Sequence, residues 1–418
     1  TAGNFVFARG TSLVDLDFVG DANPLTFLRT ASDALIQIDT VTSATAASIS
    51  PTGDLVLSAA TGDVTATTAL AAGSATVTAT TGSVTLGEVT ATNGAATVAA
   101  SGGSASVGML NGFTGATVTG SIAVSVTSAT SSSATGDIVL TAGTTASLGS
   151  GTAGRDLKVL GPAASLGAGT AAGDVFVTAT TGAATVTGVV SAGDDIEVTA
   201  TTGSVAAGSG SLTSTGVGAA DDAHVLVRST SGAVSVGTAI TQGTGTALGD
   251  VTVQAATAAS LTTGGSSRDI KVLGPAASLG SGTAAGDVFV TATTGAATVT
   301  GVVSAGDDIE VTATTGSVSA GSASLTSTGL GAADDAHVLV RSDSGSVNVG
   351  TATTQGTGTA LGNVTVQAAT SAMLASGVST RDVLVTAGTT ASLGSGTAGR
   401  DIKVLGPAAS LGSGTAAG

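Results

Sequence analysis

Cysteine, tryptophan and tyrosine are absent from this chain of 418 residues, and aromatic residues make up only 2% of it. The absence of cysteine excludes disulfides and thiolate metal sites. With so few large side chains, the chain cannot fill a thick globular core, and Val, Leu, Ile and Ala have to supply a thin one. The fold must therefore be one that needs little core volume per residue.

Basic residues are also scarce, since 11 Lys and Arg stand against 27 Asp and Glu and give a formal net charge of −16. Nucleic acid is excluded as a partner, because phosphate neutralisation requires clustered cations. No run approaches the ~18 apolar residues of a membrane helix, so we expect no membrane insertion. Residues 1–10 lack the basic and apolar regions of a signal peptide. If the protein is secreted, we expect this chain to be a processed or partial form.

An internal repeat of 113 residues dominates the second half of the chain: Arg155, Arg268 and Arg381 are spaced by 113, as are His224 and His337. Within each unit a polar residue, mostly Asp, is followed five times by alternating apolar residues, at intervals of 18, 21, 29, 26 and 19 residues. One unit therefore comprises five coils. We call these polar residues the leading column, and its members are Asp156, Asp174, Asp195, His224, Asp250, Asp269, Asp287, Asp308, His337, Asn363, Asp382 and Asp401.

Each coil predicts short strands and Gly-bearing corners. In residues 287–292, Val288, Val290 and Ala292 face one side while Phe289 and Thr291 face the other. Strands that recur every ~20 residues predict an all-β, single-stranded parallel β-helix (β-solenoid) of about 19 to 20 coils. We expect divergent coils of this solenoid at 1–50, irregular coils at 51–154 and the 113-residue repeat at 155–418. The excess length of the two longest coils should bulge out as loops at 211–223 and 238–249.

Stacked coils place equivalent residues in outward columns. Lys271, Phe289 and Glu310 fall on three consecutive coils, so a Lys stem can lie over the ring with a carboxylate one coil further on. We interpret this column as a solvated ladder in preference to a binding stripe. The basic residues of the Arg-Asp-x-Lys coils are candidates for contact between neighbouring acidic rods, and they are Arg155, Lys158, Arg268, Lys271, Arg400 and Lys403.

The leading column raises a metal hypothesis, because carboxylates one coil apart repel and Ca²⁺ could bridge them. The calcium candidates are Asp174, Asp195, Asp287 and Asp308. The competing interpretation is structural: at a corner each Asp side chain can bond its own backbone two residues on, and a preceding Arg offsets its charge. The calcium-binding solenoid signature Gly-Gly-x-Gly-x-Asp is missing. We favour structural corners and expect no cofactor.

An enzyme is not expected from this sequence. Solenoid enzymes that act on polysaccharides grip sugars with aromatic platforms and carry a single cluster of acids and bases. Here Trp and Tyr are absent, and His224 and His337 have no second His or Cys nearby. A catalytic residue also has no reason to recur once per repeat unit.

The segments AGDDIEVTATTGSV (192–205) and GRDLKVLGPAASLGAGTAAGDVFVTA (154–179) resemble the roughly 19-residue repeats of filamentous-haemagglutinin-like adhesins, which Gram-negative bacteria export by two-partner secretion. The resemblance implies a right-handed parallel β-helix, an extracellular or cell-surface location and a role in adhesion or biofilm. The family's secretion motif of Asn-Pro-Asn-Gly type is not matched by residues 21–25. No functional residues carry over, because these repeats act as a shaft.

We therefore expect a structural shaft of an extracellular bacterial fibre or adhesin, which contributes to surface attachment and biofilm matrix and self-associates into filaments or bundles. The alternative is a solenoid binding module that recognises a glycan or ice surface through Thr-rich faces, since TATTG occurs at 78–82, 178–182, 199–203, 291–295 and 312–316. A functional amyloid of short subunits is a further structural alternative. Residues 411–418 match 279–286, which precede another coil, so we expect the chain to continue or its open end to stack on another copy.

Overall fold

The computed structural model describes residues 14–18, 25–27, 30–31, 35–40, 44–50, 52–216, 223–244, 248–329, 336–356 and 361–418. It is an all-β parallel β-solenoid of about 17 turns. The first row has 19 strands, in line with the expected 19 to 20 coils; 17 of these strands begin at or after Asp54, and the other two lie in a region of which only parts are described. The right hand implied by the resemblance stays a prediction.

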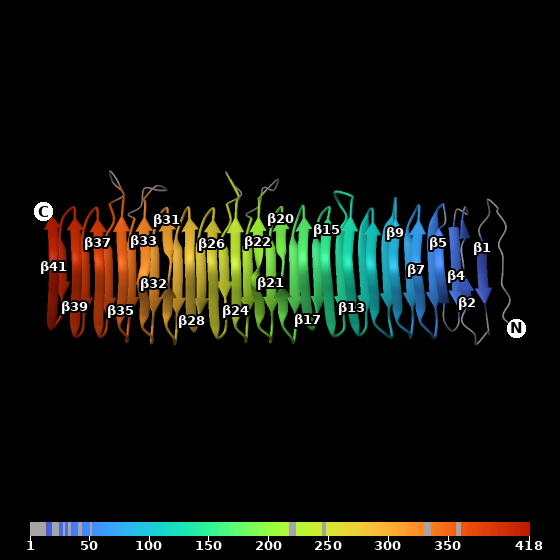
Figure 1. Ribbon diagram of the computed structural model, residues 1–418, viewed down its shortest axis with the longest axis horizontal. Helices are drawn as coiled ribbons and strands as arrows, with labels where there is room; N and C mark the ends of the chain where they lie inside the picture. Colours follow the sequence, from blue (N-terminus) through green and yellow to red (C-terminus); the bar gives the residue numbers. More distant parts are fainter. Residues whose placement is uncertain are drawn as a thin grey trace. The chain divides into compact units, whose positions relative to one another are not determined.

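The chain divides into two compact units, Thr1–Ala192 and Gly193–Gly418. The boundaries expected at residues 50 and 154 mark changes in repeat regularity and stay predictions. In each unit every turn contributes a strand to a first row and a strand, or a strand pair, to a second row, and Figure 1 shows successive strands side by side within each unit.

The first row of the first unit comprises β1 (Val14–Phe18), β4 (Leu35–Thr40), β6 (Asp54–Ala59), β8 (Ala75–Ala79), β10 (Ala95–Ala100), β12 (Gly115–Gly120), β14 (Asp137–Ala142), β16 (Leu157–Gly161) and β18 (Val175–Ala179). Its second row comprises β2 (Leu25–Phe27), β3 (Thr30–Ala31), β5 (Ala44–Ser50), β7 (Val64–Ala71), β9 (Val84–Ala91), β11 (Ala105–Gly112), β13 (Ala123–Ser131), β15 (Thr145–Ala153), β17 (Ala163–Ala171), β19 (Ala184–Val186) and β20 (Val189–Ala192).

The first row of the second unit comprises β21 (Ile196–Ala200), β23 (Val225–Ser229), β25 (Val251–Gln254), β27 (Ile270–Gly274), β29 (Val288–Ala292), β32 (Ile309–Ala313), β34 (Val338–Ser342), β36 (Val364–Ala368), β38 (Val383–Ala387) and β40 (Ile402–Leu405). Its second row comprises β22 (Val205–Ser214), β24 (Val234–Thr241), β26 (Ala258–Ser266), β28 (Ala276–Ala284), β30 (Ala297–Val299), β31 (Val302–Ala305), β33 (Val318–Ser327), β35 (Val347–Thr354), β37 (Ser371–Ser379), β39 (Thr390–Ala398) and β41 (Ala408–Ala416).

The core is a thin stack of aliphatic side chains, as the composition predicts. In β29, Val288, Val290 and Ala292 are fully buried, whereas Phe289 and Thr291 alternate with them on the outward face at intermediate exposure. Because one residue of slip would turn every apolar side chain outwards, the alternation fixes the register between coils. Along most of each strand the register pairs identical or similar residues of consecutive coils, for example between β26 and β28.

Glycine marks a bend within most second-row strands. Gly280 lies between Leu279 and Ser281, which pair with Leu261 and Thr263 while Gly280 itself is skipped. A Cβ on Gly280 would lie 2.3 Å from the backbone oxygen of Thr262. Glycine is therefore required here because two coils approach backbone to backbone.

The two loops expected from the long coils are shorter than predicted. Residues 211–214 belong to β22 and residues 238–241 belong to β24, and Leu212 and Ala239 are fully buried. The apolar alternation continues into both segments and keeps them in the sheet. The parts at 217–222 and 245–247 lie outside the described residues.

Candidate functional site

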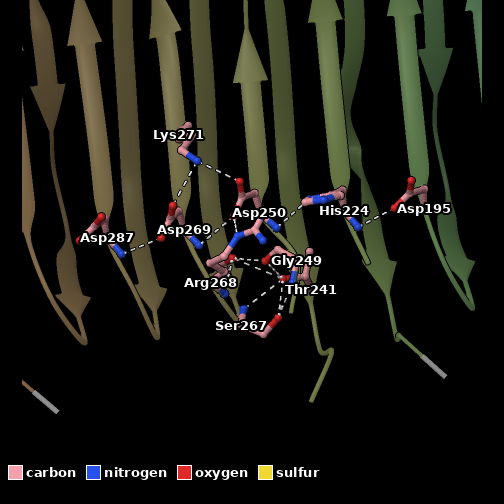
Figure 2. Close-up of polar contacts among 11 residues, drawn as sticks. Asp195, His224, Thr241, Gly249, Asp250, Ser267, Arg268, Asp269, Lys271 and Asp287 are labelled. Carbon is pink, nitrogen blue, oxygen red and sulfur yellow. Dashed lines mark hydrogen bonds and ion pairs between the residues drawn. The ribbon is translucent and has the colours of Figure 1, made fainter. Parts of the chain in front are cut away.

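Within each of the two units, the leading column forms a ladder of side-chain to backbone hydrogen bonds, part of which is drawn in Figure 2. The N–H of Asp269 donates to Oδ1 of Asp250 (3.3 Å), that of Asp287 to Oδ1 of Asp269 (3.0 Å), and that of Asp308 to Oδ1 of Asp287 (2.9 Å). We call each bond from a leading side chain to the leading N–H of the next coil a rung. Rungs also join Asn363 to Asp382 at 3.2 Å.

This geometry corrects the expected Asx corner, in which each Asp would bond its own backbone two residues on. The acceptor reaches the next coil instead, because stacking places the leading N–H of that coil within hydrogen-bond distance of Oδ1. Both arrangements satisfy a backbone donor at the corner. The ladder does more, because it ties consecutive coils together at the corner just before the first-row strands begin.

Repulsion within the ladder is relieved by basic side chains from the following coil. Arg268 Nε lies 2.6 Å from Oδ1 of Asp250, and Lys271 Nζ lies 2.9 Å from its Oδ2 and 3.1 Å from Oδ2 of Asp269. Burial acts to raise the pKa of Asp250, but hydrogen bonds from Arg268 and Lys271 outweigh it and lower the pKa to about 2. The same contacts raise the pKa of Lys271 against the opposing effect of its burial.

The same cluster recurs twice. In the first unit Arg155 forms a two-pronged pair with Asp137, and its hydrogen bond lowers the pKa of that carboxyl against the effect of burial. Lys158 pairs with Asp156 at 3.0 Å and lies over the ring of Phe176, 5.4 Å from its centroid, which is the arrangement expected above for the equivalent residues Lys271 and Phe289.

The third cluster lies in the last described coils. Arg400 pairs with Asp382 and lowers its pKa, while Lys403 Nζ lies 3.2 Å from Asp401. All six residues predicted to mediate contact between rods therefore form ion pairs within the chain, and their contact with another copy stays a prediction.

The calcium candidates are members of the ladder. Asp195, Asp287 and Asp308 each commit Oδ1 to a rung, at 2.7, 2.9 and 2.7 Å, and the N–H of Asp174 donates to Asp156 at 3.2 Å. Across the described ranges, no group of three or more His, Asp and Glu side chains is placed to hold a metal ion. The rungs give the carboxylates of Asp195, Asp287 and Asp308 a structural role between coils.

The two histidines occupy rungs in the same manner. Nδ1 of His224 accepts the N–H of Asp250 at 2.9 Å, and Nδ1 of His337 accepts that of Asn363 at 3.0 Å. A surface hollow of about 310 Å³ lies beside His224 and is lined by Asp195, Ile196, Glu197, His224, Val225, Leu226, Asp250 and Thr252. The hollow lies where the side chains of one outward column become smaller from coil to coil, from Glu197 through Leu226 to Thr252.

The Thr-rich segments do not build a long array on the first-row face. Thr291 pairs with Thr312, and their hydroxyls are 3.5 Å apart. On the next coil Thr312 pairs with Arg341, and on the preceding coil Leu273 pairs with Thr291. The register thus limits this Thr column to two consecutive coils, in agreement with the interruptions seen in the sequence.

A buried hydroxyl cluster was not predicted from the sequence. Thr241, which is 4% exposed, donates to the carbonyl of Gly249 at 2.8 Å and accepts the N–H of Ser267 at 3.0 Å, while Ser266 donates to the same carbonyl at 2.7 Å. This latch closes the 26-residue coil and is repeated at Thr354, Gly362, Ser379 and Thr380. The available signal was a pair of hydroxyl residues at core positions, recurring after 113 residues.

No protein-family model, curated protein or solved structure matches the chain. No helix in the described part of the chain has the length and apolar character needed to span a bilayer.

Proposed function

We propose that this chain is a structural shaft segment of an extracellular bacterial fibre or adhesin, similar in role to filamentous-haemagglutinin-like repeats, and that it has no enzymatic activity. The observation that carries the proposal is the ladder: in a chain with few charged residues, the leading carboxylates and the basic side chains beside them act between coils of the same chain. Side chains used in this way stiffen a stack of coils.

The mechanism is mechanical. Parallel strands bond to the coils before and after them along the stacking direction, and each rung adds a bond just before the first-row strands begin. The net charge of −16 keeps copies soluble. In this account the shaft spaces an adhesive element from the cell, and self-association of copies contributes to a matrix.

Deletion of residues 269–381 tests the spacer role, because it joins Arg268 to Asp382 and recreates an Arg-Asp junction that the chain already contains. Ala206 and Ser410 lie in one column nine coils apart, which is about 43 Å at ~4.8 Å per coil. Spin labels at these two positions, introduced as cysteines into a cysteine-free chain, should move closer by about 24 Å after deletion.

The binding-module alternative predicts another result. We expect neither the full chain nor the deletion variant to bind immobilised polysaccharides or ice. Saturable binding that disappears in a Thr293→Ala/Thr294→Ala variant would favour the binding module, and a deletion variant that unfolds or keeps its original label distance would contradict the spacer.

A further inference from the structure

The outward face of the first row in the second unit carries opposite charges at equal distances on either side of Phe289. Two columns of the strands face outwards there, one two residues and one four residues after each leading position, and the partly exposed leading column borders them. Along β27, β29 and β32 the first column reads Lys271, Phe289, Glu310 and the second reads Leu273, Thr291, Thr312. The charges on either side of Phe289 are opposite in sign and equally far from it, one coil each way.

We propose that two copies of this chain associate through this face, with a two-fold axis that runs along the strand direction and passes between the two copies of Phe289. Such an axis reverses the order of coils in the second copy while each column stays opposite itself. Lys271 of one copy then lies opposite Glu310 of the other, and the reverse pair forms on the far side of the axis. The two Phe289 rings and the two Thr291 side chains meet at the centre.

The complementarity extends beyond the central three coils. Thr252 lies opposite Leu339 and Gln254 opposite Arg341, two coils from the axis. Three coils away, Leu226 lies opposite Thr365 and Arg228 opposite Gln367. Four coils away, Glu197 lies opposite Leu384. From β21 to β38 no two like charges of these two columns face each other, whereas in the bordering leading column the axis sets Asp287 opposite itself and Asp269 opposite Asp308.

The residues at the centre are able to make these contacts. Phe289, Thr291 and Glu310 are all partly exposed. Lys271 is 31% exposed and uses its ammonium for Asp250 and Asp269, but an ammonium has three N–H donors, so one can serve Glu310 of the second copy. Nine coils of five-residue strands cover about 700 Å² on each copy, close to the ~800 Å² per partner of a standard stable interface.

Charge also explains why such a contact has to be specific. Chains with a net charge of −16 repel each other, so two copies associate only where cations of one meet acceptors of the other. This inference rests on the proposed structural role in a self-associating fibre. The spacer role and the dimer can be refuted separately, because the distance between the spin labels at positions 206 and 410 is measured within one chain, whatever its oligomeric state.

Cysteine crosslinking of the full chain tests the axis directly, because the natural chain has no thiol. A Phe289→Cys variant should form a covalent dimer with a short bismaleimide, since its two thiols face each other. Leu339→Cys alone should not, but a mixture of Leu339→Cys and Thr252→Cys should. Absence of crosslinking at Phe289, or equal crosslinking of Leu339→Cys alone, would overturn the proposal.

Charge reversal provides a matched test by sedimentation. Glu310→Lys should weaken the dimer at least tenfold, because it places two like-charged pairs beside the axis. Glu197→Lys makes the same change of charge in the same column but opposite Leu384, and should alter the dissociation constant less than threefold. Equal weakening by the two variants, or a monomeric natural chain at micromolar concentration, would overturn the axis. Circular dichroism on each variant confirms that the coils remain folded.

Discussion

Asp250 and Lys271 form an ion pair of 2.9 Å between consecutive coils, and both partners are replaced together at the equivalent positions of the next five-coil unit, Asn363 and Leu384. The carboxylate and the ammonium are thus lost as a pair. Asn363 still forms its rung through Oδ1 to the N–H of Asp382. The chain itself therefore contains both the charged and the neutral version of the same junction.

This natural pair of junctions predicts the result of a double-mutant cycle. Asp250→Asn and Lys271→Leu should each lower the local free energy of opening by about 1 kcal/mol, and the double variant should lose clearly less than the sum. Native-state amide exchange of β25 and β27 gives these local free energies. Strictly additive losses would show that the two side chains do not interact.

Acid should weaken the junction at Asp250 in a defined range. Because the pKa of Asp250 is lowered to about 2 from the ordinary value of 3.8, the unfolded chain binds the proton first, and the stabilisation is complete above pH 3.8. It should be lost as the pH falls from 3.8 to about 2, with a total on the order of 2 kcal/mol. The carboxyl ¹³C shift of Asp250 should titrate with a midpoint near 2, and a midpoint near 4 would contradict the ion-pair geometry.

At the histidine rungs, substitution by Asn should keep the hydrogen bond to the next coil, whereas substitution by Ala should remove it. His224→Ala removes the acceptor of the Asp250 N–H and should lower the local protection of that amide by about 1 kcal/mol. His224→Asn should keep it, because Asn363 already occupies an equivalent rung. Hydrogen exchange at the Asp250 amide distinguishes the two variants, and an equal loss in both would mean that the rung requires imidazole.

Gly249 should not accept a side chain. A Cβ there would lie 1.4 Å from the backbone oxygen of Ala223, and one on Gly362 would lie 1.3 Å from that of Ala336. We expect Gly249→Ala to destabilise its coil by more than about 2 kcal/mol, since backbone has to move. Gly208→Ala is the control, because its nearest neighbour is Ser235 Oγ at 3.4 Å. A Gly249→Ala chain as thermally stable as the control would contradict the close approach.

Much of the fold follows from the sequence, because a repeat of constant length has to place equivalent residues one above another. The pairing of Lys271 with Phe289 and the burial of Val288 and Val290 could be read from the spacing and the alternation alone. For the same reason, the order of the exposed side chains along these columns could be predicted.

The polar contacts were harder to predict. An Asp at a corner can bond its own backbone or that of a neighbouring coil, and the sequence pattern is the same for both; only the stacking distance decides for Asp269 and Asp287. The latch at Thr241 and Ser266 was missed because both residues sit at positions where an alternating pattern favours Ala or Val. Their hydroxyls are buried only because Gly249 brings its carbonyl to them.

The structural role is tested most directly by electron microscopy of the native material, with the subunit mass measured on the same preparation. The account predicts filaments with an axial repeat near 24 Å, which is five coils at ~4.8 Å. Compact, separate particles that cleave a polysaccharide would contradict it.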